Sequence, residues 1–377
     1  MALGWTSPNR HKIDTKIGFV SRPAGTIVMG GKVDGAGMIH RMAILGSGAW
    51  ALAMAKVVGQ KSGHAVSLWC PRTATAEILR RERGNPDLLP GITLPDSVAI
   101  ETDGVRALAG CSMLLVAVPT AFLREVLRDR AGLVPAELPV VSLVKGIETG
   151  SLSMPSDIIR REWGMRPVAV LSGPSHAEEV ARGLPAAVVV ASSDPSLAKA
   201  AQERIMTDRF RVYTNSDMTG VEWAGALKNV IGIAAGICDG LELGDNAKAA
   251  MLTRGLAEIA RSGEALGADP ATFSGLAGVG DLLTTCFSPH GRNRRLGHRI
   301  GRGESLEAAL GAGRQVVEGV NTVRALAPLA KSRGWDMPIC QGVHDVLFGD
   351  ISPRHAVENL LLRAPRPEFI PKQGKNA

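Results

Sequence analysis

The most constraining feature of this 377-residue chain is a glycine pattern that joins an apolar strand to a helix. Residues 43–51 read AILGSGAWA, and a helical pattern continues to Val58. Gly46 permits a tight turn, Gly48 lets a pyrophosphate approach the backbone, and Ala51 lets the helix pack closely against the strand. The start of that helix offers free N–H groups and a partial positive charge to phosphates. The pattern therefore predicts a dinucleotide site at a strand–helix junction.

Apolar and helical segments alternate from residue 42 onward, which predicts a doubly wound sheet covered by helices. The apolar segments are short and apolar on both faces, as the strands of a buried parallel sheet are. The expected strands cover residues 42–45, 65–69, 113–118, 140–144, 168–172, 186–191 and 210–214, with helical patterns at 121–130 and 196–205.

The pattern changes near Asn215, after which the chain is almost entirely helical. Residues 217–266 are rich in Ala, Leu and Ile, with a break expected near Gly240 and Gly244, and three later segments are also helical. We therefore predict an α/β N-terminal doubly wound (Rossmann-like) domain plus an all-α C-terminal domain. The expected organisation is a disordered extension at 1–40, a dinucleotide-binding domain at 41–215, a helical substrate domain at 216–365 and a tail at 366–377.

The extension is rich in glycine and basic residues and lacks the apolar stretch of a secretory signal. A transit peptide, a disordered extension and a translation start at Met38 or Met42 are all consistent with it. The scarcity of serine favours a disordered extension or a later start over a transit peptide.

The distribution of charge argues against nucleic-acid binding, although the net charge is +7. Residues 1–41 carry six basic and two acidic side chains, and residues 351–377 carry five and two. The remaining 32 basic and 32 acidic side chains balance. No apolar run predicts a membrane span. The five cysteines show no metal-ligand spacing, which predicts no metal site and favours a reducing cytoplasm.

The second expected strand ends in the sequence LWCPR at residues 68–72. A site selective for NAD usually places an acidic residue there to hold the ribose 2′-OH, and none is present. Arg72 could instead bind a 2′-phosphate, which favours NADP over NAD. Alternatively, Arg72 caps a surface turn.

Three further segments follow the ends of expected strands, the edge where ligands bind in such sheets. Pro119 and Thr120 could border a nicotinamide, or Pro119 could simply end the strand. Lys145 could face the ligand or be solvated. After the next strand, Ser175 could line a ligand wall, cap the following helix with Glu178 as its capping-box partner, or do both.

Lys228 is the most suggestive single residue. Its neighbours on a helix would be small or apolar, namely Ala224, Gly225, Ile231 and Gly232. A lysine in such surroundings loses solvation, which lowers its pKa into a range suited to acid–base catalysis. A lysine that reaches solvent from a helix–helix contact fits the same pattern equally well.

Two charged segments in the helical half also admit two interpretations. Asp281 follows GVG at residues 278–280 and opens a helix, so a helix N-cap is the simpler interpretation and an acidic partner for a lysine is the alternative. The run RNRR at residues 292–295 could hold a phosphate, or could be an ordinary solvated cationic run.

In this order, the motifs resemble one family, the NAD(P)-dependent glycerol-3-phosphate dehydrogenases of the prokaryotic type. The resemblance runs from about residue 42 to residue 363. It is carried by GSGAW at 46–50, KG at 145–146, GPS at 173–175, GALKNV at 225–230, GVGD at 278–281, RNRR at 292–295 and VVEG at 316–319.

The resemblance implies a role for each matched residue. Lys228 would be the proton donor and acceptor at the substrate C2 oxygen, Lys145 would contact both substrate and cofactor, and Asp281 would orient Lys228 and the substrate. The other implied substrate contacts are Gly173, Ser175, Gly291, Arg292 and Asn293. The implied cofactor contacts are Gly46, Gly48, Ala49, Trp50, Lys145, Ala177, Arg292, Val316 and Glu318, and the end of the second expected strand adds Arg72 as a candidate.

The resemblance implies that the chain reduces dihydroxyacetone phosphate to sn-glycerol 3-phosphate with NADP or NAD, reversibly, and feeds glycerophospholipid synthesis in the cytoplasm. We also expect a homodimer. The sequence departs from the family at Ala51, an allowed replacement for glycine. It departs again at Gly291, where the family often has a serine whose hydroxyl would contact the phosphate.

Two alternatives remain. Another β-hydroxyacid-type dehydrogenase, acting on a phosphorylated or carboxylated substrate, would share this architecture and a Lys-Asn pair. A non-catalytic NADP-binding regulator would not require Lys228. Short-chain dehydrogenases are excluded, because they need lysine four residues after tyrosine and the sole tyrosine, Tyr213, is followed there by Asp217.

Overall fold

The computed structural model describes residues 40–311, 317–365 and 367–368. The predicted N-terminal extension, apart from His40, and most of the predicted tail lie outside the described residues. His40 itself begins the first strand.

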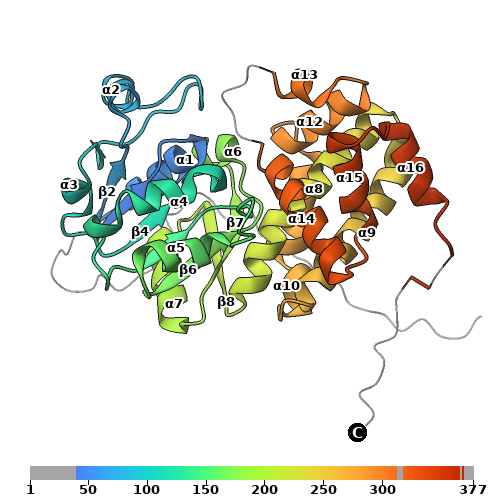
Figure 1. Ribbon diagram of the computed structural model, residues 1–377. Coiled ribbons are helices and arrows are strands. Elements are labelled where there is room, and N and C mark those ends of the chain that lie inside the picture. Colours follow the sequence, from blue (N-terminus) through green and yellow to red (C-terminus); the bar gives the residue numbers. More distant parts are fainter. Residues whose placement is uncertain (1–39, 312–316, 366, 369–377) are drawn as a thin grey trace, which may run out of the picture. The chain divides into compact units, whose positions relative to one another are not determined.

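The first half of the described chain is built around one eight-stranded sheet (Figure 1). All seven expected strands are present, together with a four-residue strand, β3, that was not predicted. Along the sheet the strands follow the order β3-β2-β1-β4-β5-β6-β7-β8. Their bounds are β1 His40–Leu45, β2 His64–Trp69, β3 Val98–Glu101, β4 Leu114–Val116, β5 Val140–Ser142, β6 Val168–Ser172, β7 Ala186–Ala191 and β8 Phe210–Asn215.

The expectation of a uniformly parallel sheet is wrong at one pair, because β6 and β7 run antiparallel. The connection between them contains only the helix α6, Ala177–Ala181. Five helical residues span about 7.5 Å, whereas a six-residue strand spans about 20 Å. This helix is therefore too short to carry the chain back across the sheet, and β7 reverses direction.

Helices cover both faces of the sheet, as the doubly wound prediction requires. The apolar faces of α1, α2, α6 and α7 share one core with the strands, and those of α3, α4 and α5 share a second core on the other face. Their bounds are α1 Ala49–Gly59, α2 Thr73–Glu82, α3 Gly104–Leu108, α4 Thr120–Arg128, α5 Pro155–Trp163 and α7 Pro195–Ile205, with a 3-10 turn, η1, at Ala131–Leu133.

The second half is helical from α8 onward, as predicted. The break between α8 and α9 falls at residues 241–243, between the two glycines expected to mark it. Its elements are α8 Met218–Gly240, α9 Gly244–Glu264, α10 Pro270–Phe273, a π-helical turn η2 Leu276–Gly280, α11 Asp281–Phe287, α12 Arg292–Gly301, α13 Leu306–Leu310, α14 Glu318–Arg333, α15 Pro338–Phe348 and α16 Pro353–Leu361.

The helix α8 is the centre of this half and packs against α9, α11, α12 and α14 (Figure 1). It is long and apolar enough to pass for a membrane span by length and composition, which the sequence analysis did not anticipate. Its most apolar window is fully buried inside the protein, however, as expected of a core helix.

Glycines bring α12 into close contact with α8. A Cβ at Gly236 would collide with the carbonyl oxygen of Arg294, and one at Gly297 would collide with that of Ile233. Because both positions lack a side chain, the two backbones approach closely. This contact brings the cationic start of α12 alongside the helix that carries Lys228.

Candidate active site

The predicted site motifs converge at the carboxyl edge of the sheet. Leu45 pairs with Val116, and Val116 pairs with Ser142, so β1, β4 and β5 end in register. The glycine pattern, Thr120 and Lys145 follow these ends, and Gly173 follows β6. Segments far apart in the sequence therefore meet at the edge where ligands bind in sheets of this type.

The glycine pattern has the geometry of a dinucleotide cradle. Gly46 has φ +134°, and a Cβ there would lie 2.7 Å from the carbonyl oxygen of Ala117. Gly48 occupies the N-cap of α1, where no side chain accepts from the first N–H groups and where a Cβ would meet nothing within 4 Å. The open backbone at Gly48 and Ala49 and the uncapped helix start fit a pyrophosphate. Ala51 is fully buried in the sheet core, so alanine fits at this position.

Two other predicted cofactor residues flank this cradle. The Trp50 indole nitrogen is buried and has no hydrogen-bond partner among the described residues. Ala177 begins α6, which packs against α1. Arg72 is exposed just after β2, at the N-cap of α2, and its side chain makes no capping hydrogen bond. Arg72 thus stands at an exposed cap position, as the alternative interpretation expects, but its side chain does not form the cap.

Three charged residues form the centre of the site. Lys145 Nζ lies 2.8 Å from Asp281 Oδ2 and also donates to Gly173 O at 2.9 Å and Ser175 Oγ at 3.2 Å. Lys228 Nζ lies 2.5 Å from Asp281 Oδ1 and donates to Thr285 Oγ1 at 2.8 Å. One carboxylate thus bridges two ammonium groups.

Burial and neighbouring charges set the protonation of this centre. Burial lowers the pKa of Lys228 to about 8, and the positive charge of Lys145 acts in the same direction, while Asp281 opposes both. Burial alone would raise the pKa of Asp281, but the charges of Lys145 and Lys228 outweigh it and hold that pKa below its usual value. With a pKa of about 8, Lys228 can exchange a proton near neutral pH, beside a carboxylate that stays ionised.

Three local interpretations made from the sequence are wrong. The N-cap of α6 is His176, without a side-chain capping bond, so Ser175 does not form a capping box with Glu178. Ser175 instead donates to Gly173 O at 2.9 Å. Asp281 is the first residue of α11, after Gly280, and its carboxylate binds the two lysines rather than the helix N–H groups. Lys228 is buried, so it does not reach solvent from a helix contact.

An amide network lies beside Lys228. Asn293 Nδ2 donates to Asn229 Oδ1 at 2.9 Å, and Gly319 N–H donates to Asn293 Oδ1 at 3.0 Å. Asn229 also donates weakly to Lys145 O at 3.4 Å. This network joins α8, α12, α14 and the Lys145 loop, so it holds the start of α12 in place.

The start of α12 presents Arg292 at an exposed position, with Gly291 as its N-cap. A Cβ at Gly291 would lie 2.9 Å from Thr285 O, so a serine at this position would require a shift of this loop. The solvated-run interpretation fails for Arg294, which pairs with Asp239 at 2.6 Å.

Glu318 connects the helical half to the sheet. Its Oε1 accepts from Thr120 N–H at 3.0 Å, and its Oε2 and Thr120 Oγ1 are buried without a partner among the described residues. Burial raises the pKa of Glu318. Pro119 is the N-cap of α4 and Thr120 its first residue. Val316, another predicted cofactor contact, lies outside the described residues.

Two residues of the site were not assigned a role from the sequence, namely Thr285 and Asn229. Asp281 and Thr285 stand four residues apart on α11 and hold the same ammonium group, and that spacing on a helix was the available signal. Asn229 lies inside a matched motif and directly follows Lys228, but the residues around it do not indicate a role in the site.

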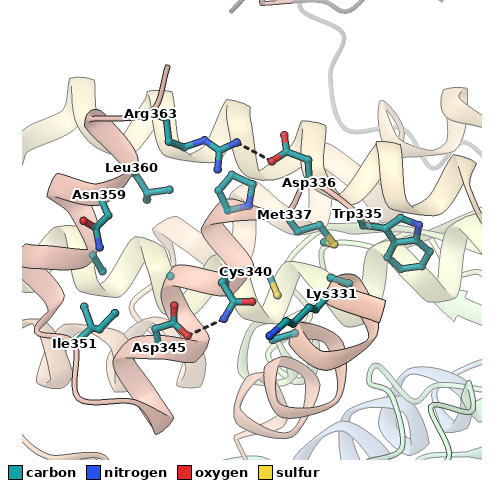
Figure 2. A pocket seen from close by; sticks show the side chains of 16 residues that line it. Lys331, Trp335, Asp336, Met337, Cys340, Asp345, Ile351, Asn359, Leu360 and Arg363 are labelled. Atoms are coloured by element: carbon teal, nitrogen blue, oxygen red, sulfur yellow. Dashed lines mark hydrogen bonds and ion pairs between the residues drawn. The ribbon is translucent and has the colours of Figure 1, made fainter. Parts of the chain in front are cut away.

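A separate hollow of about 350 Å³ lies in the helical half, and Figure 2 shows its lining. Arg363 pairs with Asp336 at 2.7 Å on one side of the hollow, and Asp345 lies on the other side. Asp345 accepts a hydrogen bond from Gln341 at 2.7 Å. None of the predicted site residues lines it, and we do not assign it to the reaction. Among the described residues, no group of three His, Cys, Asp or Glu side chains could hold a metal ion.

Comparison with known proteins gives two family matches along the chain. Residues 41–198 match the model for the N-terminus of NAD-dependent glycerol-3-phosphate dehydrogenase, and residues 217–358 match the model for its C-terminus. Together the two models cover most of the chain, on both sides of the change from sheet to helices.

Full-length relatives give the same result. The chain is 46% identical over 334 residues to a glycerol-3-phosphate dehydrogenase [NAD(P)+] of Geobacillus kaustophilus, which covers 88% of this chain and 97% of that protein. A Mycobacterium tuberculosis relative with the same activity name is 46% identical and covers 88% and 100%. The crystal structure of glycerol-3-phosphate dehydrogenase from Coxiella burnetii superposes with a TM-score of 0.82 at 38% identity, covering 86% and 99%.

Proposed function

Because the chain belongs to the NAD-dependent glycerol-3-phosphate dehydrogenase family, we propose that it reduces dihydroxyacetone phosphate to sn-glycerol 3-phosphate with NAD(P)H, reversibly. It is an NAD(P)-dependent oxidoreductase. The observation that best supports this reaction is the Asp281 carboxylate held between Lys145 and Lys228. This arrangement provides one proton donor and one fixed positive charge at the carboxyl edge of the sheet.

When bound, the reduced nicotinamide supplies a hydride to the carbonyl carbon of the substrate. Negative charge then grows on the carbonyl oxygen, and Lys228 donates a proton to that oxygen as the alcohol forms. Lys145 adds a positive field that stabilises the same charge. Asp281 accepts from both ammonium groups and fixes their positions. In the oxidation direction, neutral Lys228 accepts the hydroxyl proton.

The substrate phosphate has a binding group at the start of α12. Arg292 offers a guanidinium at the first position of this helix, where the helix N-terminus also attracts anions. Asn293 is held by Asn229 and Gly319, which fixes the turn that carries Arg292. Ser175 and Gly173 complete the polar wall beside Lys145.

For the cofactor we favour NADP over NAD. Arg72 is exposed after β2, where an NAD-selective site usually carries an acidic residue, and it forms no ion pair within the described part of the chain. Kinetics with NADPH and NADH test this preference, and a clear preference for NADH would refute it.

We further infer a homodimeric enzyme of the cytoplasm whose product enters glycerophospholipid synthesis. The five cysteines are unpaired, as expected in a reducing compartment. Leu361 and Leu362 at the end of α16 are largely exposed, and a second copy of the chain could cover them in a dimer. Light scattering tests the dimer. Complementation of a bacterium that cannot make glycerol 3-phosphate tests the cellular role.

The activity itself is tested by following NADPH oxidation with dihydroxyacetone phosphate. Unphosphorylated dihydroxyacetone is the matched control for the phosphate group. A hydroxyisobutyrate or 6-phosphogluconate substrate tests the related β-hydroxyacid reaction in the reverse direction. Tight NADPH binding without turnover of any of these compounds would instead favour the regulator.

A further inference from the structure

We propose that Arg124 on α4 is a positioning residue for Lys145, acting through Glu148. This inference rests on the proposed function, in which Lys145 supplies part of the positive charge at the substrate. None of the motifs found in the sequence includes Arg124. Its role follows from three sets of contacts: with Glu148, within the Lys145 loop, and at the start of α4.

The first contact is a two-pronged ion pair. Arg124 Nε lies 2.8 Å from Glu148 Oε1, and Arg124 Nη2 lies 2.7 Å from Glu148 Oε2. Arg124 Nη1 also binds Glu162 on α5. The Arg124 and Glu148 side chains are only 24% and 16% exposed, so water screens the pair only partly. A guanidinium that binds both carboxylate oxygens fixes the orientation as well as the distance.

The second set of contacts makes Glu148 the closing point of the Lys145 loop. Glu148 N–H donates to Ser153 O at 3.1 Å, and Leu152 N–H donates to Glu148 O at 3.0 Å. Ser151 Oγ donates to the Glu148 carboxylate. Between Lys145 and Glu148, Ile147 is buried in the core of the helical half. The loop is therefore held by apolar packing on one side and by Arg124 on the other.

The third contact lies one helical turn before Arg124. Thr120, four residues earlier on α4, donates its N–H to Glu318. Gly146 is wedged in the same place, because a Cβ there would collide with Thr120 Oγ1 and lie 2.9 Å from Glu318 Oε2. One face of α4 thus fixes Gly146 from the N-terminal turn and Glu148 from the next turn. Lys145 is adjacent to one of these anchors and three residues from the other.

This arrangement has a consequence for the proton donor. The charged or titratable groups that face Lys228 are Lys145, Asp281 and Cys286, with His176 close enough to feel its charge. Lys145 lowers the pKa of Lys228 and Asp281 raises it. If the loop loses its anchor and Lys145 moves away, the pKa of Lys228 should rise.

The test compares Arg124→Gln and Glu148→Gln with Arg128→Gln. Arg128 is a matched control on the same helix, because it pairs with Glu162, is 67% exposed and forms no ion pair with Glu148 in the described part of the chain. The pKa of Lys228 is measured in two ways: from the alkaline limb of the kcat/KM profile for reduction, and from the pH dependence of Lys228 acetylation by acetic anhydride, read by mass spectrometry. The second measurement needs no turnover.

The direction of the pKa shift of Lys228 in Glu148→Gln decides between two explanations. A through-space effect alone would lower the pKa of Lys228, because a negative charge has been removed. Loss of positioning instead raises that pKa, by about half a unit or more, and raises KM for dihydroxyacetone phosphate about tenfold. Arg124→Gln should shift both quantities in the same direction as Glu148→Gln. Arg124→Lys keeps the charge but loses the two-pronged geometry, so it should give a smaller shift of the same sign.

The inference is overturned if Glu148→Gln, with a melting temperature like that of Arg128→Gln, lowers the pKa of Lys228 or leaves it unchanged. It is also overturned if Arg128→Gln produces the same shifts as Arg124→Gln. Should Glu148→Gln fail to fold, Arg124→Lys carries the test by itself, and an unchanged pKa and KM in that variant would refute the role. If the wild-type protein does not reduce dihydroxyacetone phosphate, the proposed function fails. The acetylation experiment needs no turnover, so the pKa of Lys228 still shows whether Arg124 and Glu148 hold Lys145 in place.

Discussion

Lys145 and Lys228 share one carboxylate, with their ammonium nitrogens 2.8 Å and 2.5 Å from different oxygens of Asp281. The two lysines come from opposite halves of the chain, one from the loop after β5 and one from α8. Three charges with a net value of +1 therefore lie at the edge of the sheet. An oxygen that becomes negative during the reaction would balance that excess.

Replacement of Lys228 should remove most of the catalysis. Lys228→Ala deletes the proton donor, so we expect kcat to fall by about 10²-fold or more. Steady-state kinetics measure the loss, and fluorescence titration with NADPH checks that the cofactor still binds. Lys331, on the surface of α14, serves as a matched lysine-to-alanine control. A Lys228→Ala enzyme with near-normal kcat would exclude Lys228 from proton transfer.

The rate should depend on pH with opposite signs in the two directions. Reduction needs the ammonium form of Lys228 as proton donor. Because the pKa of Lys228 is lowered to about 8, kcat/KM for reduction should be constant below that pH. Above it, kcat/KM for reduction should fall about tenfold per pH unit. Oxidation of glycerol 3-phosphate needs the neutral amine, so its kcat/KM should rise through the same pH. A limb near 10.5, the ordinary value for lysine, would show that burial does not perturb this group.

Two glycines of the cradle should respond differently to alanine. Gly48→Ala adds a methyl group to open space, so the melting temperature should stay close to wild type while Kd for NADPH rises about tenfold, because the pyrophosphate cannot approach. Gly46→Ala should instead lower the free energy of unfolding by about 2 kcal/mol, because φ is +134° and the methyl group would meet Ala117 O. Equal effects of both variants on stability would contradict this distinction.

Arg72 should determine the cofactor preference. Loss of a charged hydrogen bond costs about 1.5–3 kcal/mol, so Arg72→Ala should raise KM for NADPH about 10- to 100-fold and leave KM for NADH nearly unchanged. Arg81→Ala is the control, because Arg81 is an exposed arginine of α2 that pairs only with Glu82 among the described residues. An equal increase of KM for both cofactors would mean that Arg72 does not distinguish them.

Two buried carboxylates should make the protein less stable as the pH rises. Glu222 accepts from Ser156 N–H and Oγ, and Glu258 accepts from the N–H groups of Ile339 and Cys340. Burial raises the pKa of each to about 7 from 4.5. The folded state therefore binds more protons than the unfolded state between these values. The resulting stability is complete below pH 4.5 and is lost as the pH rises through about 7, by at most about 3 kcal/mol per group.

Glu222→Gln and Glu258→Gln should each flatten this pH dependence, measured by urea unfolding between pH 5 and about 8. Glu77→Gln, at an exposed position of α2, is the control and should leave the slope unchanged. A wild-type protein that gains stability across the same interval would show that both carboxylates are ionised in the folded state.

The strands were predictable where the sequence is apolar on both faces. β3 was missed because its four residues alternate in exposure and end in Glu101. The reversed direction of β7 could not be predicted from its residues either, because parallel and antiparallel central strands have the same apolar pattern when both faces are buried. Only the length of α6 indicates the reversal, and the sequence analysis did not delimit that helix.

The segments that form the site could be predicted from the sequence, but the contacts between their side chains could not. Lys228 is marked by its small neighbours, whereas Asp281 looks like an ordinary helix cap until α11 is placed against α8 and Lys145. Its partners lie 53 and 136 residues away, so no local pattern identifies them. Asn293 and Gly319 likewise meet only because glycines let α12 pack closely against α8.

The burial of α8 has a consequence for synthesis of the chain. When this helix emerges from the ribosome, its later packing partners α9, α11, α12 and α14 have not yet emerged. A 23-residue segment with the hydropathy of a membrane span then lacks the helices that cover most of it. Nascent chains in this interval expose an aggregation-prone surface and are natural clients for chaperones. The helix that surrounds Lys228 with apolar side chains thus exposes apolar surface in the middle of translation.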